Sequence, residues 1–363
     1  MGGELETPNL EKKPIDEKNN FFRYGSNRVQ GFKKSLDVFN IYENIKQLEE
    51  KNIYIFGIFD GHSGKEISQY LSENFCKELL KNENFIIEHY QKALIETFIN
   101  MDNSLRKEEV NNILKEILQK NRLKNKEKIN NFFKENNNDL NEEDLNDINT
   151  FMDILDPNNL EDVLISDYMG SSGLIILIEK NLTYIANAGN SHFIIINKHL
   201  EINNKILEKQ KNEEIEEKKR IKIGKGIKYG KQIKSEKYIY TRGFGDFQFK
   251  INNLINIDTK EILSEPFLYE INNKDVKYII AFNDGVYENF KFINNIEKDK
   301  NDIYKMISDY FIEHLKDEKP ISSIISDLFE NNLIKFKIEA NNKNNIRNVV
   351  ANNLSCTIIE FFS

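Results

Sequence analysis

One apolar segment of the chain ends in residues that could bind a metal ion and move protons. The run from Ile53 to Phe59 is rich in isoleucine and aromatic residues and has the length of a buried strand. Asp60 follows it where the strand would leave the core, Gly61 leaves its carbonyl oxygen accessible to an ion, and His62 can exchange protons near neutral pH. Because Asp-Gly is also a common turn, this segment alone supports both interpretations.

A second segment repeats the pattern. The run from Lys277 to Ala281 is again apolar and β-branched, and Phe282, Asn283, Asp284 and Gly285 follow it. Carboxylates at two strand ends can converge on Mg²⁺ or Mn²⁺, which are hard cations that prefer oxygen ligands. The two segments together predict a binuclear hydrolytic site.

Composition limits the classes of protein to consider. The chain has 363 residues, enough for one large domain, and its net charge of −8 argues against general nucleic-acid binding. Its two cysteines, Cys76 and Cys356, offer neither a disulfide framework nor the spacing of a zinc site. There is no apolar run of membrane-spanning length and no signal-peptide pattern, so we expect a location in the cytoplasm or nucleus. We also expect a monomer.

The amino terminus could carry a lipid. Gly2 follows the initiator methionine, as N-myristoylation requires, but Glu6 occupies the position where serine or threonine is usual, and Thr7 comes one place late. A single acyl chain would give only weak membrane association.

The elements that must position these residues can be outlined from apolar spacing. Helical spacing covers Ser63 to Lys81, and further helices are expected over 85–105, 303–315 and 321–333. Residues 1–20 are interpreted as an extension and residues 21–363 as a single domain. Residues 107–164, rich in Asn, Lys, Glu and Asp, are interpreted as an insertion that is partly helical and partly disordered.

Strand patterns fill the second half of the chain. Runs at 174–178 and 183–188, joined by a turn, predict a hairpin that the run 193–197 continues, and 355–362 predicts a last strand. The glycines Gly224, Gly226 and Gly230 lie in a highly charged stretch and predict a solvated turn rather than a phosphate loop. Blocks of strands and helices therefore predict an α+β domain.

Eight short motifs follow one another in a fixed order. They are Arg23-Tyr24-Gly25 with Gln30-Gly31-Phe32, Asp60-Gly61-His62-Ser63-Gly64, Asp167-Tyr168-Met169-Gly170-Ser171-Ser172, Ala186-Asn187-Ala188-Gly189-Asn190-Ser191, Thr241-Arg242-Gly243-Phe244-Gly245-Asp246-Phe247, Ser264-Glu265-Pro266, Asn283-Asp284-Gly285-Val286-Tyr287-Glu288 and Asn352-Asn353-Leu354-Ser355. In this order the chain resembles the metal-dependent protein serine/threonine phosphatases of type 2C. The resemblance implies a four-layer α-β-β-α sandwich with a binuclear site at one end.

The resemblance also assigns roles to the metal ligands. Asp60 would bridge two Mg²⁺ or Mn²⁺ ions, Gly61 would offer its carbonyl oxygen, and Asp37 and Asp284 would complete the inner shell. Asn352 occupies another ligand position, and Asp167 matches a looser third metal site. The ions would activate a bridging water and neutralise the phosphate.

Other residues take the remaining roles that the resemblance implies. His62 would protonate the leaving alkoxide of a phosphoprotein substrate, Lys33 would bind its phosphate, and Asp246 would fix a loop near the cleft.

Four positions depart from the family pattern. Asp37 stands in place of a glutamate, Val38 in place of an acidic residue that orients metal-bound waters, and Asn352 in place of a ligating aspartate. Lys33 replaces an arginine and cannot form its two parallel bonds to phosphate. We expect a weakened phosphatase that binds two ions, or one. The alternatives are a pseudophosphatase that regulates a partner protein and, more remotely, another two-metal hydrolase.

Overall fold

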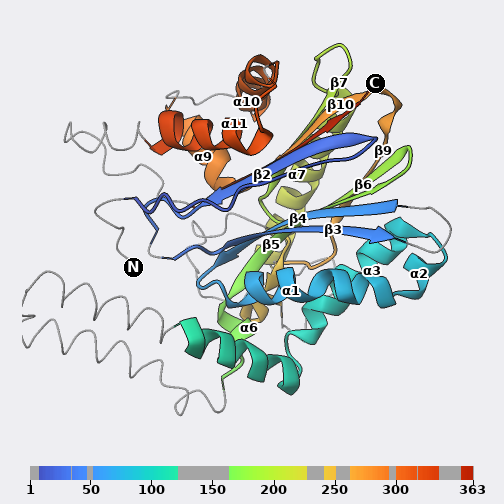
Figure 1. Ribbon diagram of the computed structural model, residues 1–363. Helices are drawn as coiled ribbons and strands as arrows, with labels where there is room; N and C mark the ends of the chain where they lie inside the picture. The colour runs from blue at the N-terminus through green and yellow to red at the C-terminus, as the bar shows by residue number, and fades with distance from the viewer. Residues whose placement is uncertain are drawn as a thin grey trace, which may run out of the picture.

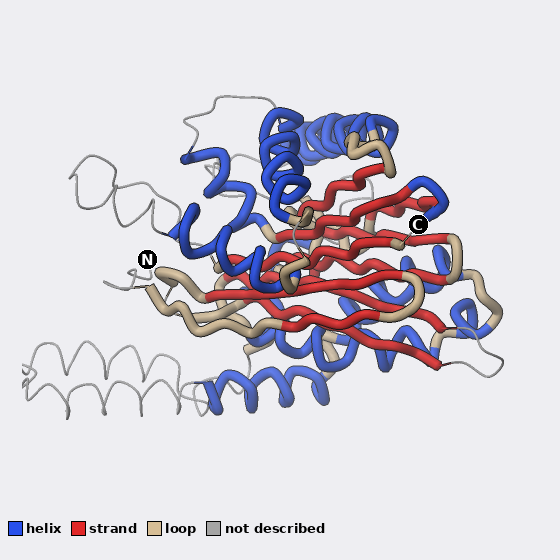
Figure 2. Tube along the Cα trace, turned by 45° about the horizontal axis from the view of Figure 1, so that its top comes forward, coloured by secondary structure: helices blue, strands red, loops and turns tan. Residues whose placement is uncertain are grey.

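The protein forms a sandwich of two antiparallel sheets with helices on both outer faces (Figures 1 and 2). The computed structural model describes residues 8–33, 35–46, 52–121, 163–226, 241–250, 262–293, 300–316, 318–334 and 353–362. This arrangement confirms the α+β class and the four-layer sandwich. The division of the chain at residue 20 and the insertion at 107–164 stay predictions.

The first sheet joins both ends of the described chain. Its strand order is β1-β2-β11-β10-β7, and every neighbouring pair is antiparallel. The bounds are β1 (Ile15–Lys18), β2 (Phe22–Val29), β11 (Leu354–Phe361), β10 (Val276–Phe282) and β7 (His192–Asn197). Strand β1, from the segment interpreted as an extension, forms an edge of this sheet.

The second sheet contains the strand that carries Asp60. Its order is β3-β4-β5-β6-β9, and the short β8 pairs with β5. The bounds are β3 (Val38–Lys46), β4 (Asn52–His62), β5 (Gly170–Glu179), β6 (Leu182–Ala188), β9 (Phe267–Asn272) and β8 (Phe244–Gly245). Antiparallel pairing of β5 with β6 confirms the predicted hairpin.

The expectation that residues 193–197 continue this hairpin was wrong, because β7 crosses to the first sheet and pairs with β10. The chain leaves the second sheet at Gly189, whose φ of 128° is accessible to glycine and rarely to other residues. Strand β7 is buried on both faces, since Phe193 and Ile195 face the inter-sheet core while Ile194 and Ile196 face the outer helices. An apolar run of this kind does not reveal which sheet it joins.

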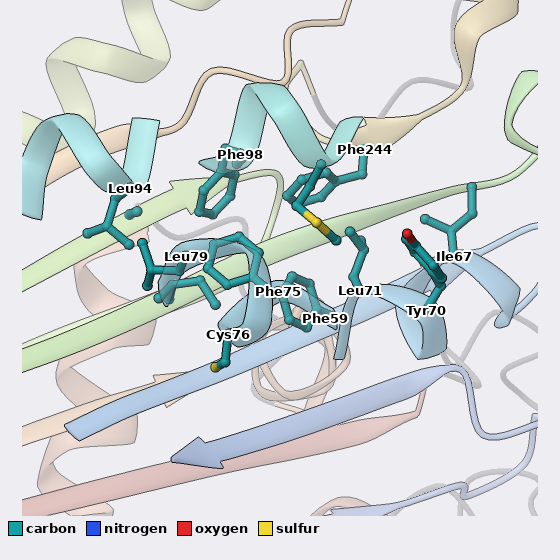
Figure 3. Packing of buried hydrophobic residues seen from close by; sticks show 14 of the residues in the cluster. Phe59, Ile67, Tyr70, Leu71, Phe75, Cys76, Leu79, Leu94, Phe98 and Phe244 are labelled. Atoms are coloured by element: carbon teal, nitrogen blue, oxygen red, sulfur yellow. The ribbon is translucent and has the colours of Figure 1, made fainter. Parts of the chain in front are cut away.

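Helices α1 (Glu66–Lys81), α2 (Glu83–Ile86) and α3 (Tyr90–Ser104) cover the second sheet. Figure 3 shows Phe59 of β4 among Phe75, Phe98 and Phe244, and the Phe98 and Phe244 rings stack at 5.0 Å. The helix expected over 85–105 is interrupted before α3, at Glu88, whose φ is 64°. Residues 108–121 form a further helix whose buried side chains join this core.

The outer face of the first sheet is covered by helices from the C-terminal part of the chain. These are α9 (Asp284–Ile293), α10 (Lys300–His314), α11 (Ile321–Asp327) and a π-helical segment (Leu328–Ile334). Their apolar side chains pack with Ile280 and Ile358 of the sheet. The helices expected over 303–315 and 321–333 are thus confirmed, the second with a wider turn in its last part.

Helix α7 (Asn204–Gly226) contacts strands of both sheets. Gln210 donates a hydrogen bond to the carbonyl of Phe193 in β7, and Lys209 donates one to Leu268 in β9. The solvated turn expected at Gly224 and Gly226 was wrong, because both belong to the last turn of α7. Gly230 lies outside the described residues.

The remaining short elements are α6 (Ile165–Tyr168), α8 (Phe247–Lys250) and a 3₁₀ turn (Asn273–Asp275). None of the helices in the described ranges is long and apolar enough to cross a membrane.

Candidate metal and phosphate site

Four strand ends meet at one end of the sandwich. Val38, the first residue of β3, pairs with Asp60 near the end of β4. Asn283 follows β10, and its side-chain amide donates to Asp60 Oδ2 at 2.9 Å while its Oδ1 accepts from the backbone of Ser355 in β11. One buried asparagine therefore links the first sheet to the acidic end of the second.

A second asparagine holds the loop that precedes β3. Asn353 is 1% exposed, and its Oδ1 accepts from the backbone amide of Asp37 at 2.8 Å. Its Nδ2 donates to the carbonyls of Gln30 and Ser35 at 3.0 and 2.9 Å. Lys33 and Asp37, which this loop carries, are thus placed relative to β11.

Asp37 is buried next to the Asp60 turn. Its backbone carbonyl accepts from the Gly61 amide at 3.0 Å and from the Ser68 hydroxyl at 2.7 Å. Its carboxylate accepts from Ser35 at 2.5 Å and lies 3.6 Å from the Lys33 ammonium. A side chain at Gly61 would approach Ser68 Oγ to 2.6 Å, so the close packing of this turn requires glycine.

Electrostatics in this region favour a cation. Burial raises the pKa of Asp60, and Asp37 raises it further, against the opposing effect of Lys33 and the Asn283 hydrogen bond. Burial likewise raises the pKa of Asp37, although Lys33 and Ser35 oppose the shift. Burial, Glu288 and Asp60 raise the pKa of Asp284 to about 7. Lys33 acts on all three carboxylates, and its single positive charge cannot balance three negative charges.

The donor chemistry of this end fits a hard divalent cation, since oxygen ligands that repel one another are stabilised by an ion between them. The side chains as they stand do not form a finished cage: across the described ranges, no three His, Cys, Asp or Glu side chains are grouped closely enough to hold a metal ion. Asn352, another expected ligand, lies outside the described residues.

His62 is oriented by an acid from a distant part of the chain. Its Nε2 lies 2.6 Å from Oδ2 of Asp246, which is 3% exposed and has a φ of 52°. Gly170 makes room for this pair, because a Cβ there would lie 2.2 Å from the Asp246 carboxylate. From the sequence, Asp246 was expected to fix a loop near the cleft, and its contact with His62 was missed.

The third-site ligand expected at Asp167 has a different neighbour. Asp167 lies in α6 with its Oδ1 3.8 Å from Arg106, and that oxygen has no hydrogen-bond partner. The charged groups with the largest effect on Asp284 are Glu288 and Asp60. Glu288, one helical turn after Asp284 in α9, was missed as a site residue although its spacing places it on the same helix face.

The two sheets and their covering helices define the class of α-β-β-α sandwich proteins, and comparison with known proteins identifies the family within this class. The family model for protein phosphatase 2C matches residues 22–118 and 110–292. "Probable protein phosphatase 2C 4" of Paramecium tetraurelia is 25% identical over 301 residues, which cover 81% of this chain and 84% of the relative. The chain belongs to the protein phosphatase 2C family.

Two further matches are consistent with this assignment. "Protein phosphatase 2C 1" of the same organism is 25% identical over 291 residues, covering 79% of this chain and 80% of the relative. A crystal structure of a phosphatase from Toxoplasma gondii has the same fold, with a TM-score of 0.57 at 12% identity, covering 97% of this chain and 96% of that one.

Proposed function

We propose that the chain hydrolyses phosphoserine and phosphothreonine in proteins with Mg²⁺ or Mn²⁺, at reduced efficiency. The observation that carries this proposal is the hydrogen bond from Asn283 to Asp60. Because Asn283 directly precedes Asp284, the first residue of α9, this bond holds the acidic end of β4 next to the acidic start of α9. Family membership supports the reaction class and its metal dependence.

The proposed ion-binding residues are Asp60, Asp37 and Asp284, with the Gly61 carbonyl and Asn352. Bound ions would supply an activated water and neutralise the phosphate. Two ions are expected from the family pattern, and Asp167 is the candidate for a weak third. Because Asn352 is uncharged, we expect weaker ion binding than an aspartate would give.

The proposed roles of the chain's own side chains follow from their positions. Lys33 is half-buried beside Asp37 and can offer one positive charge to the substrate phosphate. His62, held by Asp246, can donate a proton to the leaving serine or threonine oxygen. Asn283 holds the end of β4 by its bond to Asp60, and Asn353 holds the loop that carries Lys33 and Asp37.

A pseudophosphatase that regulates a partner protein is the second candidate, and one observation favours it. Val38 is fully buried in the core between the sheets, so it offers nothing to a bound ion or its waters.

A manganese titration of phosphopeptide hydrolysis separates the two candidates. The native chain is compared with Asp60→Asn, with Asn352→Asp, and with Asp309→Asn on the exposed face of α10 as a matched control. We expect native turnover that Asp60→Asn lowers by about 10²- to 10³-fold, that Asn352→Asp raises, and that Asp309→Asn leaves unchanged. Native turnover no higher than that of Asp60→Asn at millimolar Mn²⁺ would establish the pseudophosphatase. Calorimetry with Mn²⁺ then counts the bound ions.

A further inference from the structure

A cavity of about 440 Å³ adjoins the candidate site on the side of α7. Asp284 and Glu288 of α9 line it together with Gln210, Glu213 and Glu217 of α7, and Asn187 of β6. Its size is within the usual range for a ligand pocket. A group bound here would therefore lie next to an acid that we assign to ion binding.

Two amide oxygens at this cavity have no hydrogen-bond partner. Gln210 is 9% exposed, and its Nε2 donates to the Phe193 carbonyl, which fixes the amide orientation and leaves Oε1 unpaired. Asn187 donates from Nδ2 to the Ser191 carbonyl at 2.8 Å, which likewise leaves its Oδ1 unpaired. Buried acceptors without a donor are costly, so these oxygens indicate a missing donor.

The charges around the cavity give the same indication. Five carboxylates and three lysines line it. Each lysine has a carboxylate partner, with Lys218 2.7 Å and Lys300 3.8 Å from Glu214, and Lys291 3.7 Å from Glu288. Lys218 and Lys291 are also largely open to solvent, at 68% and 46% side-chain exposure.

Glu217 is paired with Arg220 at 2.6 Å and with Arg242 at 2.9 Å, so its charge is balanced. Glu213 lies 3.9 Å from the exposed Lys209, and Asp284 forms no ion pair among the described residues. Glu213 and Asp284 are thus the lining carboxylates whose charge is least balanced.

We propose that this cavity binds the side chain of a basic residue, arginine in particular, that flanks the phosphorylated residue of the substrate. A guanidinium has five N–H donors and no acceptor, which complements the unpaired oxygens of Gln210 and Asn187. Its positive charge also complements the weakly paired carboxylate of Glu213. The proposal rests on the proposed phosphatase function and specifies its substrates as basic phosphopeptides.

The test uses phosphothreonine peptides with one arginine placed in turn at each position around the phosphothreonine. Each peptide is matched by one with citrulline, which keeps the shape and removes the charge. At one position we expect kcat/KM about tenfold higher for arginine. The ratio should fall towards one in Gln210→Leu and in Glu213→Gln, and it should be unchanged in Glu208→Gln, on an exposed face of α7. Thermal unfolding verifies folding, and if Gln210→Leu does not fold, Glu213→Gln alone decides.

A ratio near one at every position, or a ratio that survives in folded Gln210→Leu and Glu213→Gln, overturns the proposal. Hydrolysis of p-nitrophenyl phosphate reports separately on the phosphatase function. If neither that compound nor the peptides are hydrolysed, the phosphatase function fails, and fluorescence anisotropy of the labelled peptides tests the cavity alone. Preferential binding of the arginine peptide that Gln210→Leu removes would support it, and equal binding of arginine and citrulline would overturn it.

Discussion

Two regions of the molecule hold buried or partly buried aspartates, and they differ in how the negative charge is balanced. Asp102 of α3 is 3% exposed, and both of its oxygens accept from Lys250 at 2.8 Å. Oδ1 also accepts from the Gly245 amide, and Lys250 donates in addition to the Gly243 carbonyl. At the strand ends, by contrast, Asp37 raises the pKa of Asp60 and Asp60 raises the pKa of Asp284, and all three lie near the half-buried Lys33.

The difference separates an aspartate whose charge is balanced within the protein from the strand-end aspartates, which we propose bind ions. The Asp102 pair is complete within the protein, so it fastens α3 to the segment that carries β8 and α8. The strand-end acids have no such partner, which supports the proposal that they bind a cation. Substitution of an aspartate should therefore lower the free energy of unfolding in the first region and raise it in the second, in the absence of metal.

The largest effect is expected at the complete pair. Asp102→Ala leaves the Lys250 ammonium buried without its counter-ion and should lower the free energy of unfolding by about 3–5 kcal/mol. Urea denaturation measures it. The double variant Asp102→Leu, Lys250→Met should recover most of this loss, because it removes both charges; a loss below about 1 kcal/mol in Asp102→Ala would show that the pair is not structural.

A smaller effect of opposite sign is expected at Asp284. Its pKa of about 7 in the folded protein lies above the value of about 3.9 in an unfolded chain. Between these values the folded state binds a proton that the unfolded state does not, so the metal-free protein should lose stability as pH rises from about 4 through about 7.

Asp284→Asn should reduce that loss and make the metal-free protein more stable at pH 8 by about 1–3 kcal/mol. Denaturation curves at several pH values, with and without Mn²⁺, measure this, and Mn²⁺ should stabilise the native chain more than the variant. An equally steep pH dependence in Asp284→Asn would assign the titration to another group.

The smallest effect is expected at Lys33. Lys33→Arg should raise kcat/KM for phosphopeptides a few-fold, up to about tenfold, because a guanidinium can form two parallel bonds with a phosphate. Lys198→Arg, an exposed position after β7, serves as the matched control. A decrease in kcat/KM would indicate that arginine pairs with Asp37 instead of the substrate.

Sequence reasoning found the elements whose signals are local. The apolar run before Asp60, the hairpin of β5 and β6, and the amphipathic helix α1 were all predicted, since strand length, turn residues and helical spacing lie within a few residues of one another. Helix α7 was missed because it lacks this local signal. Its buried positions carry Gln210 and Glu217 instead of apolar side chains.

By itself, the sequence determined the family, the four-layer fold and the acids that end β4 and begin α9, because motif order and local pattern are written along the chain. Tertiary structure alone decided that β7 joins the first sheet, that Asn283 reaches Asp60, and that Asp246 holds His62. Those partners are 223 and 184 positions apart in the two hydrogen-bonded pairs. Contacts over such separations depend on how both sheets pack, and no local pattern encodes them.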